Sequence, residues 1–249
     1  MLNIGLSEFQ RLFRTPLAWV LLALVQLILA YLFLVQVENY ISTIQPQIIA
    51  NQAPYGVTDL VLTQLFTYAG LLMLAIMPLL TMRSFAEERQ NQTLTLLRAA
   101  PISATQIVLG KYLALELLVL VLISMISLMP LSLLLGTSLD IGQLLSAILG
   151  LFLLLSSFAA AGLFLSSLTK QTMMAALLGF AFLLILGLLY FAGTRAEQPS
   201  DLLLYLSHFG HYQSFLSGII NSTDVIYYLL FITVFLVLTI RKLDNERLG

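Results

Sequence analysis

The stretch Arg83-Ser-Phe-Ala-Glu-Glu-Arg-Gln-Asn-Gln-Thr-Leu-Thr-Leu-Leu-Arg-Ala-Ala-Pro-Ile-Ser103 is a short charged segment between two long apolar runs. Its Glu, Arg and Gln side chains are those of a solvated, helix-prone connection. Leu94, Leu96 and Leu97 follow directly, and leucines exposed together in a polar connection need a covering surface. The segment is therefore predicted to contact another molecule, in addition to joining two membrane spans.

The composition predicts an all-α integral membrane protein. The 249-residue chain has only 9% charged residues, whereas a soluble domain has about 25%. It contains no cysteine, which excludes disulfides, thiolate metal sites and cysteine nucleophiles. Apolar runs of about 20 residues are long enough to cross a bilayer. Six transmembrane helices are expected in a single domain (1–249), at about 16–37, 60–82, 108–136, 141–169, 171–193 and 224–241.

The positions of the cations predict the orientation in the membrane. With six spans and a cytoplasmic N-terminus, all 11 Lys and Arg residues except Arg195 are cytoplasmic. If the seventh apolar stretch at 201–223 also crossed, three more cations would move outside, against the positive-inside rule. This stretch is therefore predicted to form an outer re-entrant hairpin between spans five and six, and both termini are predicted to be cytoplasmic.

Residues 1–15 predict an amphipathic interfacial helix on the inner face of the membrane, before the first span. The alternative is an ordinary basic flank of that span. The apolar residues at helical spacing are Leu2, Leu6, Phe9 and Phe13.

A second start signal lies after the charged segment. Pro101 ends its helix, and Ser103-Ala-Thr-Gln106 matches a capping box, in which the Ser and Gln side chains bind each other's free amides. A new helix is expected to begin at about Ala104 and to enter the membrane beyond Lys111.

The dipeptide Gly110-Lys111 resembles the end of a phosphate-binding loop. That motif requires Gly at 105 and Ser or Thr at 112, where this chain has Thr105 and Tyr112. The chain is therefore not expected to bind a nucleotide or to be an enzyme, and no bound cofactor or metal is expected. Energy from ATP would have to enter through another chain.

Three polar residues within apolar stretches leave alternatives open. Glu116, inside the third span, has either a structural partner or a role in a transport path. His208 and His211 have a spacing that a metal site can use, but no carboxylate completes a ligand set in the same turn, so they are interpreted as ordinary polar residues of the outer hairpin. An aromatic stripe on the hairpin is interpreted as an interfacial anchor, with an exit gate as the alternative. The stripe consists of Tyr205, Phe209, Tyr212 and Phe215.

The region 78–112 resembles the type-2 ABC transporter permeases. The matching pieces are Pro78-Leu-Leu-Thr-Met-Arg-Ser-Phe-Ala-Glu-Glu-Arg89, Gln92-Thr-Leu-Thr-Leu-Leu97, Pro101-Ile-Ser103 and Gly110-Lys-Tyr112. They are similar to the pattern that recurs between the second and third spans of that family. The chain is most similar to permeases of gliding motility and of nitrous-oxide-reductase maturation.

This resemblance implies a permease subunit of an ABC exporter in the bacterial inner membrane. The segment 83–103 would dock onto a separate ABC ATPase subunit that holds ATP and Mg. A second permease copy or a sister permease would complete the assembly, in contact with membrane lipid and not with nucleic acid. The residues expected to take part in ATPase coupling are Arg83, Glu87, Glu88, Arg89, Thr93, Leu94, Leu97 and Pro101.

Two other functions compete with this one. The first is an ion- or proton-coupled carrier that uses Glu116 and works without ATP. The second is a mechanical transmitter of the same fold that moves no solute. The sequence does not identify a substrate.

Overall fold

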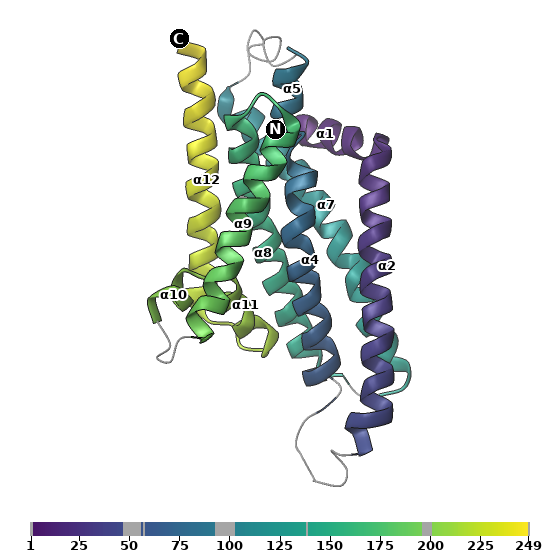
Figure 1. Ribbon diagram of the computed structural model, residues 1–249. Helices are drawn as coiled ribbons and strands as arrows, with labels where there is room; N and C mark the ends of the chain where they lie inside the picture. Colours follow the sequence, from purple (N-terminus) through teal and green to yellow (C-terminus); the bar gives the residue numbers. More distant parts are fainter. Residues whose placement is uncertain are drawn as a thin grey trace.

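The computed structural model describes residues 2–46, 56, 58–92, 103–137, 139–195 and 201–248. All regular secondary structure in these ranges is helical, and six of the helices are long and apolar enough to cross a membrane. The predicted all-α class with six spans is confirmed. Figure 1 shows these helices side by side as an elongated bundle.

The spans are named in chain order. They are α2 (Pro16–Asn39), α4 (Thr63–Thr81), α7 (Ala104–Ser132), α8 (Ile141–Leu168), α9 (Thr172–Arg195) and α12 (Ser222–Leu248). Short π-helical turns extend α2 at Tyr40–Ile44 and precede α4 at Thr58–Leu62, and a 3₁₀ turn extends α7 at Leu133–Leu135. The remaining helices are α1 (Leu2–Arg14), α5 (Ala86–Gln90), α10 (Asp201–Leu206) and α11 (His208–Leu216).

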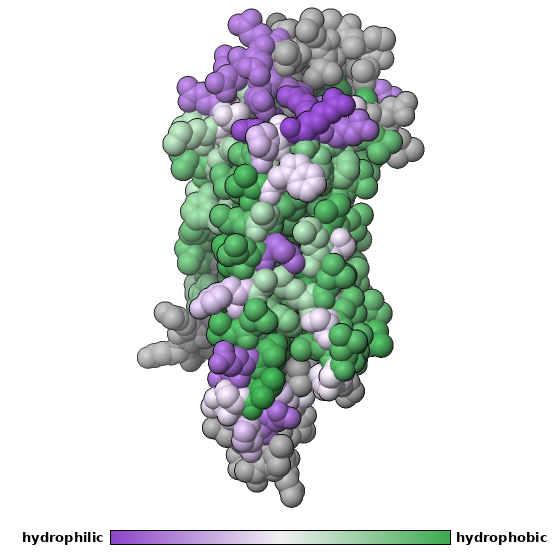
Figure 2. Space-filling view, turned by 90° about the vertical axis from the view of Figure 1, so that its right-hand side faces the viewer, coloured by the Kyte–Doolittle hydropathy of each residue, from purple (hydrophilic) through white to green (hydrophobic). Residues whose placement is uncertain are grey.

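The bundle has two different ends. Helix α1 lies across one end, where α5 and, on the other side of the bundle, the C-terminal part of α12 also lie, and α10 and α11 lie at the opposite end (Figure 1). We call these the α1 end and the α11 end. Figure 2 shows hydrophilic residues gathered at the α1 end and apolar residues over the middle of the molecule. This distribution is the one that a bilayer-spanning bundle requires.

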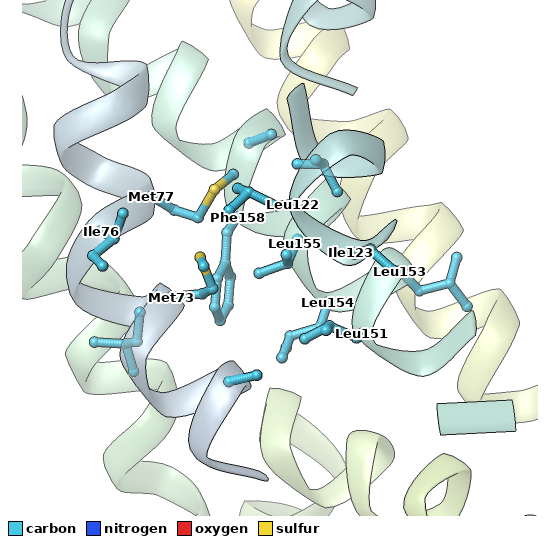
Figure 3. Packing of buried hydrophobic residues seen from close by; sticks show 14 of the residues in the cluster. Met73, Ile76, Met77, Leu122, Ile123, Leu151, Leu153, Leu154, Leu155 and Phe158 are labelled. Carbon is cyan, nitrogen blue, oxygen red and sulfur yellow. The ribbon is translucent and has the colours of Figure 1, made fainter. Parts of the chain in front are cut away.

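Helix α8 is the centre of the bundle. In its most apolar 18-residue stretch 72% of the residues are buried, against 28% in α2, α9 and α12. Figure 3 shows Leu151, Leu154 and Phe158 of α8 packed near Met73 and Met77 of α4, and all five side chains are almost completely buried. Spans α4, α7, α9 and α12 therefore pack around α8, and α2 packs on α4 and α7.

The peripheral helix α2 shows the opposite pattern. Leu22, Val25 and Leu29 lie on one helical face and are buried, whereas Leu27 and Tyr31 are 72% and 65% exposed. Exposed apolar side chains on a span face lipid or another membrane protein. Helix α2 is therefore hydrophobic on all sides because one face packs in the bundle and the other faces lipid or another membrane protein.

The helix starts follow from local hydrogen bonds. The Ser103 Oγ accepts a bond from the Gln106 amide, and the Gln106 Oε1 accepts one from the Ser103 amide, both at 3.2 Å. The predicted capping box is thus confirmed. Asp140 caps α8 in a similar way, because its Oδ1 accepts bonds from the amides of Gly142 and Gln143.

Glycine allows close packing of α8 against α4. A Cβ atom added to Gly162 would collide with the side chain of Thr81, which is itself buried. Both residues lie inside helices whose backbones cannot easily move apart, because the surrounding core is densely packed.

We expect Gly162→Val to destabilise the protein by about 1–3 kcal/mol, the usual cost of overpacking a core. The measurement is thermal unfolding of the protein in detergent. Gly136→Val is the matched control, because no heavy atom lies within 4 Å of a Cβ built at Gly136. Equal unfolding temperatures for the two variants would contradict this account of the α4–α8 contact.

Candidate functional site

The segment that follows α4 is fixed to α8 by one buried hydroxyl. The Ser166 Oγ accepts hydrogen bonds from the amides of Phe85 and Ala86, each at 3.1 Å, and donates one to the Met82 carbonyl at 2.9 Å. These backbone groups lie where α4 ends and α5 begins, so they lack partners within a helix. Ser166 therefore holds the start of α5 against the central helix of the bundle.

A buried ion pair joins α5 to α7. Glu88 and Lys111 are only 2% and 3% exposed, and the Lys111 Nζ lies 2.6 Å from the Glu88 Oε1. The same Nζ lies 3.1 Å from Glu8, and the Arg11 guanidinium lies 3.3 Å from the Glu88 Oε1. Two carboxylates and two cations from α1, α5 and α7 thus form one cluster, which we call the charge cluster.

Burial makes each member of the central pair depend on the other. Removing a carboxylate or an ammonium group from water costs several kcal/mol, and only a close opposite charge with further hydrogen bonds offsets that cost. The Nζ of Lys111 also lies 5.3 Å from the centre of the Phe85 ring, within the range of a cation–π interaction. The charge cluster therefore fixes α5 in one position relative to α1 and α7.

The crossing of α1 over α7 depends on two glycines. A Cβ on Gly110 would lie 2.7 Å from the Ile4 side chain, and a Cβ on Gly5 would lie 3.3 Å from the Gly110 carbonyl oxygen. This close approach brings Glu8 of α1 within reach of Lys111 of α7. Gly110-Lys111 thus has a structural role: the glycine admits α1, and the lysine binds it.

A second ion pair connects α5 to the last helix. The Arg89 Nη2 lies 2.8 Å from both carboxylate oxygens of Glu246, and the two side chains are 12% and 20% exposed. Lys242, one turn earlier on α12, lies 3.3 Å from the same carboxylate. Segments 157 residues apart in the chain are therefore held together at the α1 end.

Arg83 and Glu87 line a cleft beside the charge cluster. The cleft has a volume of about 50 Å³, and Thr15 and Ser84 also line it. Sites for small organic ligands usually measure about 300–1,000 Å³. The cleft is thus large enough for water molecules but too small for a nucleotide.

The predicted coupling residues fall into two groups. The structure brings Arg83, Glu87, Glu88 and Arg89 together at the α1 end, with Glu88 pointing into the bundle. Their coupling role stays a prediction. Four further predicted residues lie outside the described part of the chain: Thr93, Leu94, Leu97 and Pro101.

The sequence analysis did not identify the partners of these residues. Glu8, Arg11, Lys111 and Glu246 belong to the same ion pairs but are far from Glu88 and Arg89 in the chain. One signal was available, because a lysine about two helical turns inside a long apolar helix needs an acidic partner. The sequence alone did not show which carboxylate would supply it.

Glu116 is separate from the charge cluster and contacts α8. Its Oε2 accepts a hydrogen bond of 2.7 Å from the Ser156 Oγ, and the Tyr112 hydroxyl is a second neighbour. This contact favours the structural interpretation of Glu116. A role of Glu116 in a transport path stays a prediction.

At the α11 end, polar contacts hold α11 against the spans. The Tyr212 hydroxyl donates to the Phe66 carbonyl at 2.9 Å, and the Gln143 amide nitrogen donates to the Leu216 carbonyl at 2.9 Å. Phe209, Tyr212 and Phe215 are buried, and only Tyr205 of the predicted aromatic stripe is largely exposed, at 63%. The interpretation of this stripe as an interfacial anchor is therefore wrong for three of its four residues, which pack in the core because α11 turns them towards α4 and α8.

The two histidines of this end have different surroundings. The His211 Nδ1 lies 2.6 Å from Asp224, and its Nε2 lies 2.8 Å from the Tyr205 carbonyl oxygen. Both ring nitrogens of His211 thus lie against hydrogen-bond acceptors, a carboxylate and a backbone carbonyl. Burial, and next the neighbouring His211, lower the pKa of His208 to about 3. Among the residues that the structure describes, no group of three or more potential ligands is arranged to hold a metal ion.

Six apolar spans and the polar ends described above define a multi-pass integral membrane protein. The sequence model described as ABC-2 family transporter protein matches residues 2–248. The chain therefore belongs to the ABC-2 transporter family and is a membrane permease subunit, of a kind consistent with the bacterial inner membrane. In this family the membrane subunit is not itself catalytic, and it normally works with an ATPase subunit. No curated protein matches the chain.

We expect Glu88→Gln to destabilise the protein by about 3–5 kcal/mol, because it leaves the buried Lys111 ammonium without its closest counter-charge. The measurement is thermal unfolding in detergent. Glu38→Gln is the control, since Glu38 is exposed and neutralising an exposed carboxylate changes stability by less than about 1 kcal/mol. Equal effects of the two substitutions would show that the Glu88–Lys111 pair does not hold α5.

The low pKa of His208 predicts a pH dependence of stability. The histidine binds a proton near pH 6.5 in the unfolded chain but only at about pH 3 in the folded protein. Acidification through this window therefore favours unfolding, and the loss between pH 7.5 and pH 5 is about 2 kcal/mol. In unfolding experiments at both pH values, His208→Asn should remove this part of the dependence. An unchanged pH dependence in His208→Asn would show that His208 is not kept neutral by burial.

Proposed function

We propose that this permease subunit couples ATP hydrolysis on a separate ABC ATPase subunit to export of a substrate. The segment 83–103 is the docking element, and the α1 end faces the cytoplasm. The observation that carries the proposal is the firm attachment of α5 to three different parts of the bundle: Ser166, the charge cluster and Glu246. A segment anchored in this way moves the spans when a partner moves it.

The distribution of cations supports this orientation. Of the Lys and Arg residues in the described part of the chain, nearly all lie at the α1 end, including Arg14, Lys170 and Arg241, and Arg195 ends α9 at the other side. Cytoplasmic connections of membrane proteins carry such an excess of cations. In this orientation α1 is an interfacial helix on the cytoplasmic face, and α10 with α11 forms a re-entrant hairpin on the outer face.

The composition of the docking segment supports a protein partner. Its first part is polar and anchored, and the sequence then continues with Leu94, Leu96 and Leu97. Apolar side chains next to charged ones are typical of interfaces between protein subunits. ATP and Mg would be bound by the partner, because the described cleft at this end is too small for a nucleotide.

A second permease copy or a sister permease would complete the assembly. The exposed apolar faces of α2, α9 and α12 offer surface both for lipid and for such a neighbour. The chain has no large outer domain between its spans, so substrate would reach the outside directly past the α11 end.

Co-purification under mild detergent tests the proposal. We expect an ATPase subunit to accompany the parent protein, and Leu97→Asp to reduce its recovery about tenfold or more, because a buried charge without a partner weakens an interface by several kcal/mol. Glu88→Ala should also reduce recovery, by releasing α5 from the bundle, with membrane insertion intact in both variants.

Gln171→Asp is the control, since it adds a carboxylate at an exposed position of another connection at the same end. Full ATPase recovery with both Leu97→Asp and Glu88→Ala would refute the docking assignment. Transport that needs no ATP and stops in Glu116→Gln would instead identify an ion-coupled carrier. ATP turnover in vesicles without solute movement would identify a mechanical transmitter.

A further inference from the structure

Helix α12 connects the two ends of the bundle without interruption. It has 27 residues and contains neither glycine nor proline, and at 1.5 Å per residue it is about 40 Å long. By contrast, Pro78 and Pro130 lie inside α4 and α7, where proline weakens a helix and allows it to bend. A movement applied to one end of α12 is therefore expected to reach its other end.

At the α1 end, α12 is attached to the docking segment. Arg89 of α5 contacts both carboxylate oxygens of Glu246 at 2.8 Å. Both side chains are mostly buried, and Leu243 between this contact and the span is 1% exposed. Hydrogen bonds between ionised groups at such short distances are stronger than those between neutral groups.

At the α11 end, α12 is attached to the hairpin by three side chains close to its start. Asp224 pairs with His211 at 2.6 Å, and the Tyr228 hydroxyl donates to the His208 carbonyl at 2.7 Å. The Tyr227 hydroxyl lies 2.9 Å from the Leu206 carbonyl, which precedes α11. These contacts link α12 to both α10 and α11.

Helix α12 packs against α8, and most of its surface is not covered by the rest of the chain. Only 28% of its most apolar stretch is buried, against 72% in α8. Helix α2 also lacks internal glycine and proline, but it has no comparable ion pair to the docking segment among the described residues. Helix α8 is also attached to both elements, through Ser166 to α5 and through Gln143 to α11, but it is the buried centre of the bundle and contains three glycines. Among the described residues, α12 combines a glycine-free and proline-free helix with charged contacts to both α5 and α11.

We propose that α12 is a transmission rod that carries movement of the docking segment to the outer hairpin, with Glu246 and Asp224 as positioning residues at its two ends. This inference rests on the proposed function, because the ATPase subunit supplies the movement. Hydrolysis can bias the hairpin only if the contacts of α12 differ between two states of the assembly.

The test measures the accessibility of the hairpin while the ATPase subunit binds ATP at the α1 end. The chain has no cysteine, so Gln213→Cys introduces a single thiol, at an exposed position of α11. In vesicles that contain the permease with its ATPase subunit, a membrane-impermeant maleimide labels this thiol, with and without Mg-ATP and vanadate. We expect the labelling rate of the parent to change when ATP is trapped.

Glu246→Gln and, independently, Asp224→Asn should each reduce this ATP-dependent change about tenfold, within the usual range of coupling between sites. The ATPase subunit should still co-purify with both variants. Asp244→Asn is the matched control and should respond as the parent does. Asp244 is exposed on the same turn of α12 as Glu246, and the substitution removes the same charge. The exchange Arg89→Glu with Glu246→Arg should restore part of the response.

Three results would overturn the rod. The first is an ATP-dependent labelling change in both Glu246→Gln and Asp224→Asn as large as in the parent. The second is loss of the ATPase subunit from Glu246→Gln. The third is a charge-exchange variant that still binds the ATPase but recovers none of the ATP-dependent labelling change. Each of them leaves the proposed function standing, because the parent still binds its ATPase and responds to ATP. A parent that binds no ATPase would instead refute the proposed function, and the rod with it.

Discussion

The contact between Glu88 and Lys111 is the constraint on which the α1 end depends. Each side chain is almost completely buried, and neither charge is stable there without the other. Their pairing determines where α5 lies, and it draws in Glu8 and Arg11 of α1. Three helices that the apolar core alone would not fix in relative position are therefore held in one arrangement.

This arrangement gives a physical reason for a sequence pattern. Glu88 and Gly110-Lys111 belong to separate pieces of the stretch 78–112, and the structure joins them in one contact. Gly110 permits the crossing of α1, Lys111 and Glu88 hold it, and Arg89 turns to the last helix. The described pieces of the pattern thus meet in one junction that joins α1, α5, α7 and α12.

Much of the fold could be predicted from the sequence, because it follows from local signals. Long uncharged runs determine the six spans, and Ser103 and Gln106 determine the start of α7 within one residue. The site was only half predictable. The charges of the segment 83–103 were visible, but its partners Glu246 and Lys111 reach it through tertiary packing, for which one sequence holds no local signal.

The aromatic residues of α11 show the same limit. Phe209, Tyr212 and Phe215 have a spacing that suits either a membrane interface or a packed core. The packed core is distinguished by the Phe66 carbonyl, which lies 146 positions earlier in the chain and accepts a hydrogen bond from the Tyr212 hydroxyl. A helical pattern shows which side chains share a face, but it does not show what covers that face.

The pairing of Glu8 with Lys111 also orders the events of biosynthesis. The ribosome must add 103 residues after Glu8 before Lys111 exists, which takes roughly 5–20 s at about 5–20 residues per second. Throughout that interval α1 lacks its contact with α7, while the first two spans are already being inserted. The N-terminal helix is therefore one of the last parts of this half of the protein to reach its native place, although it is translated first.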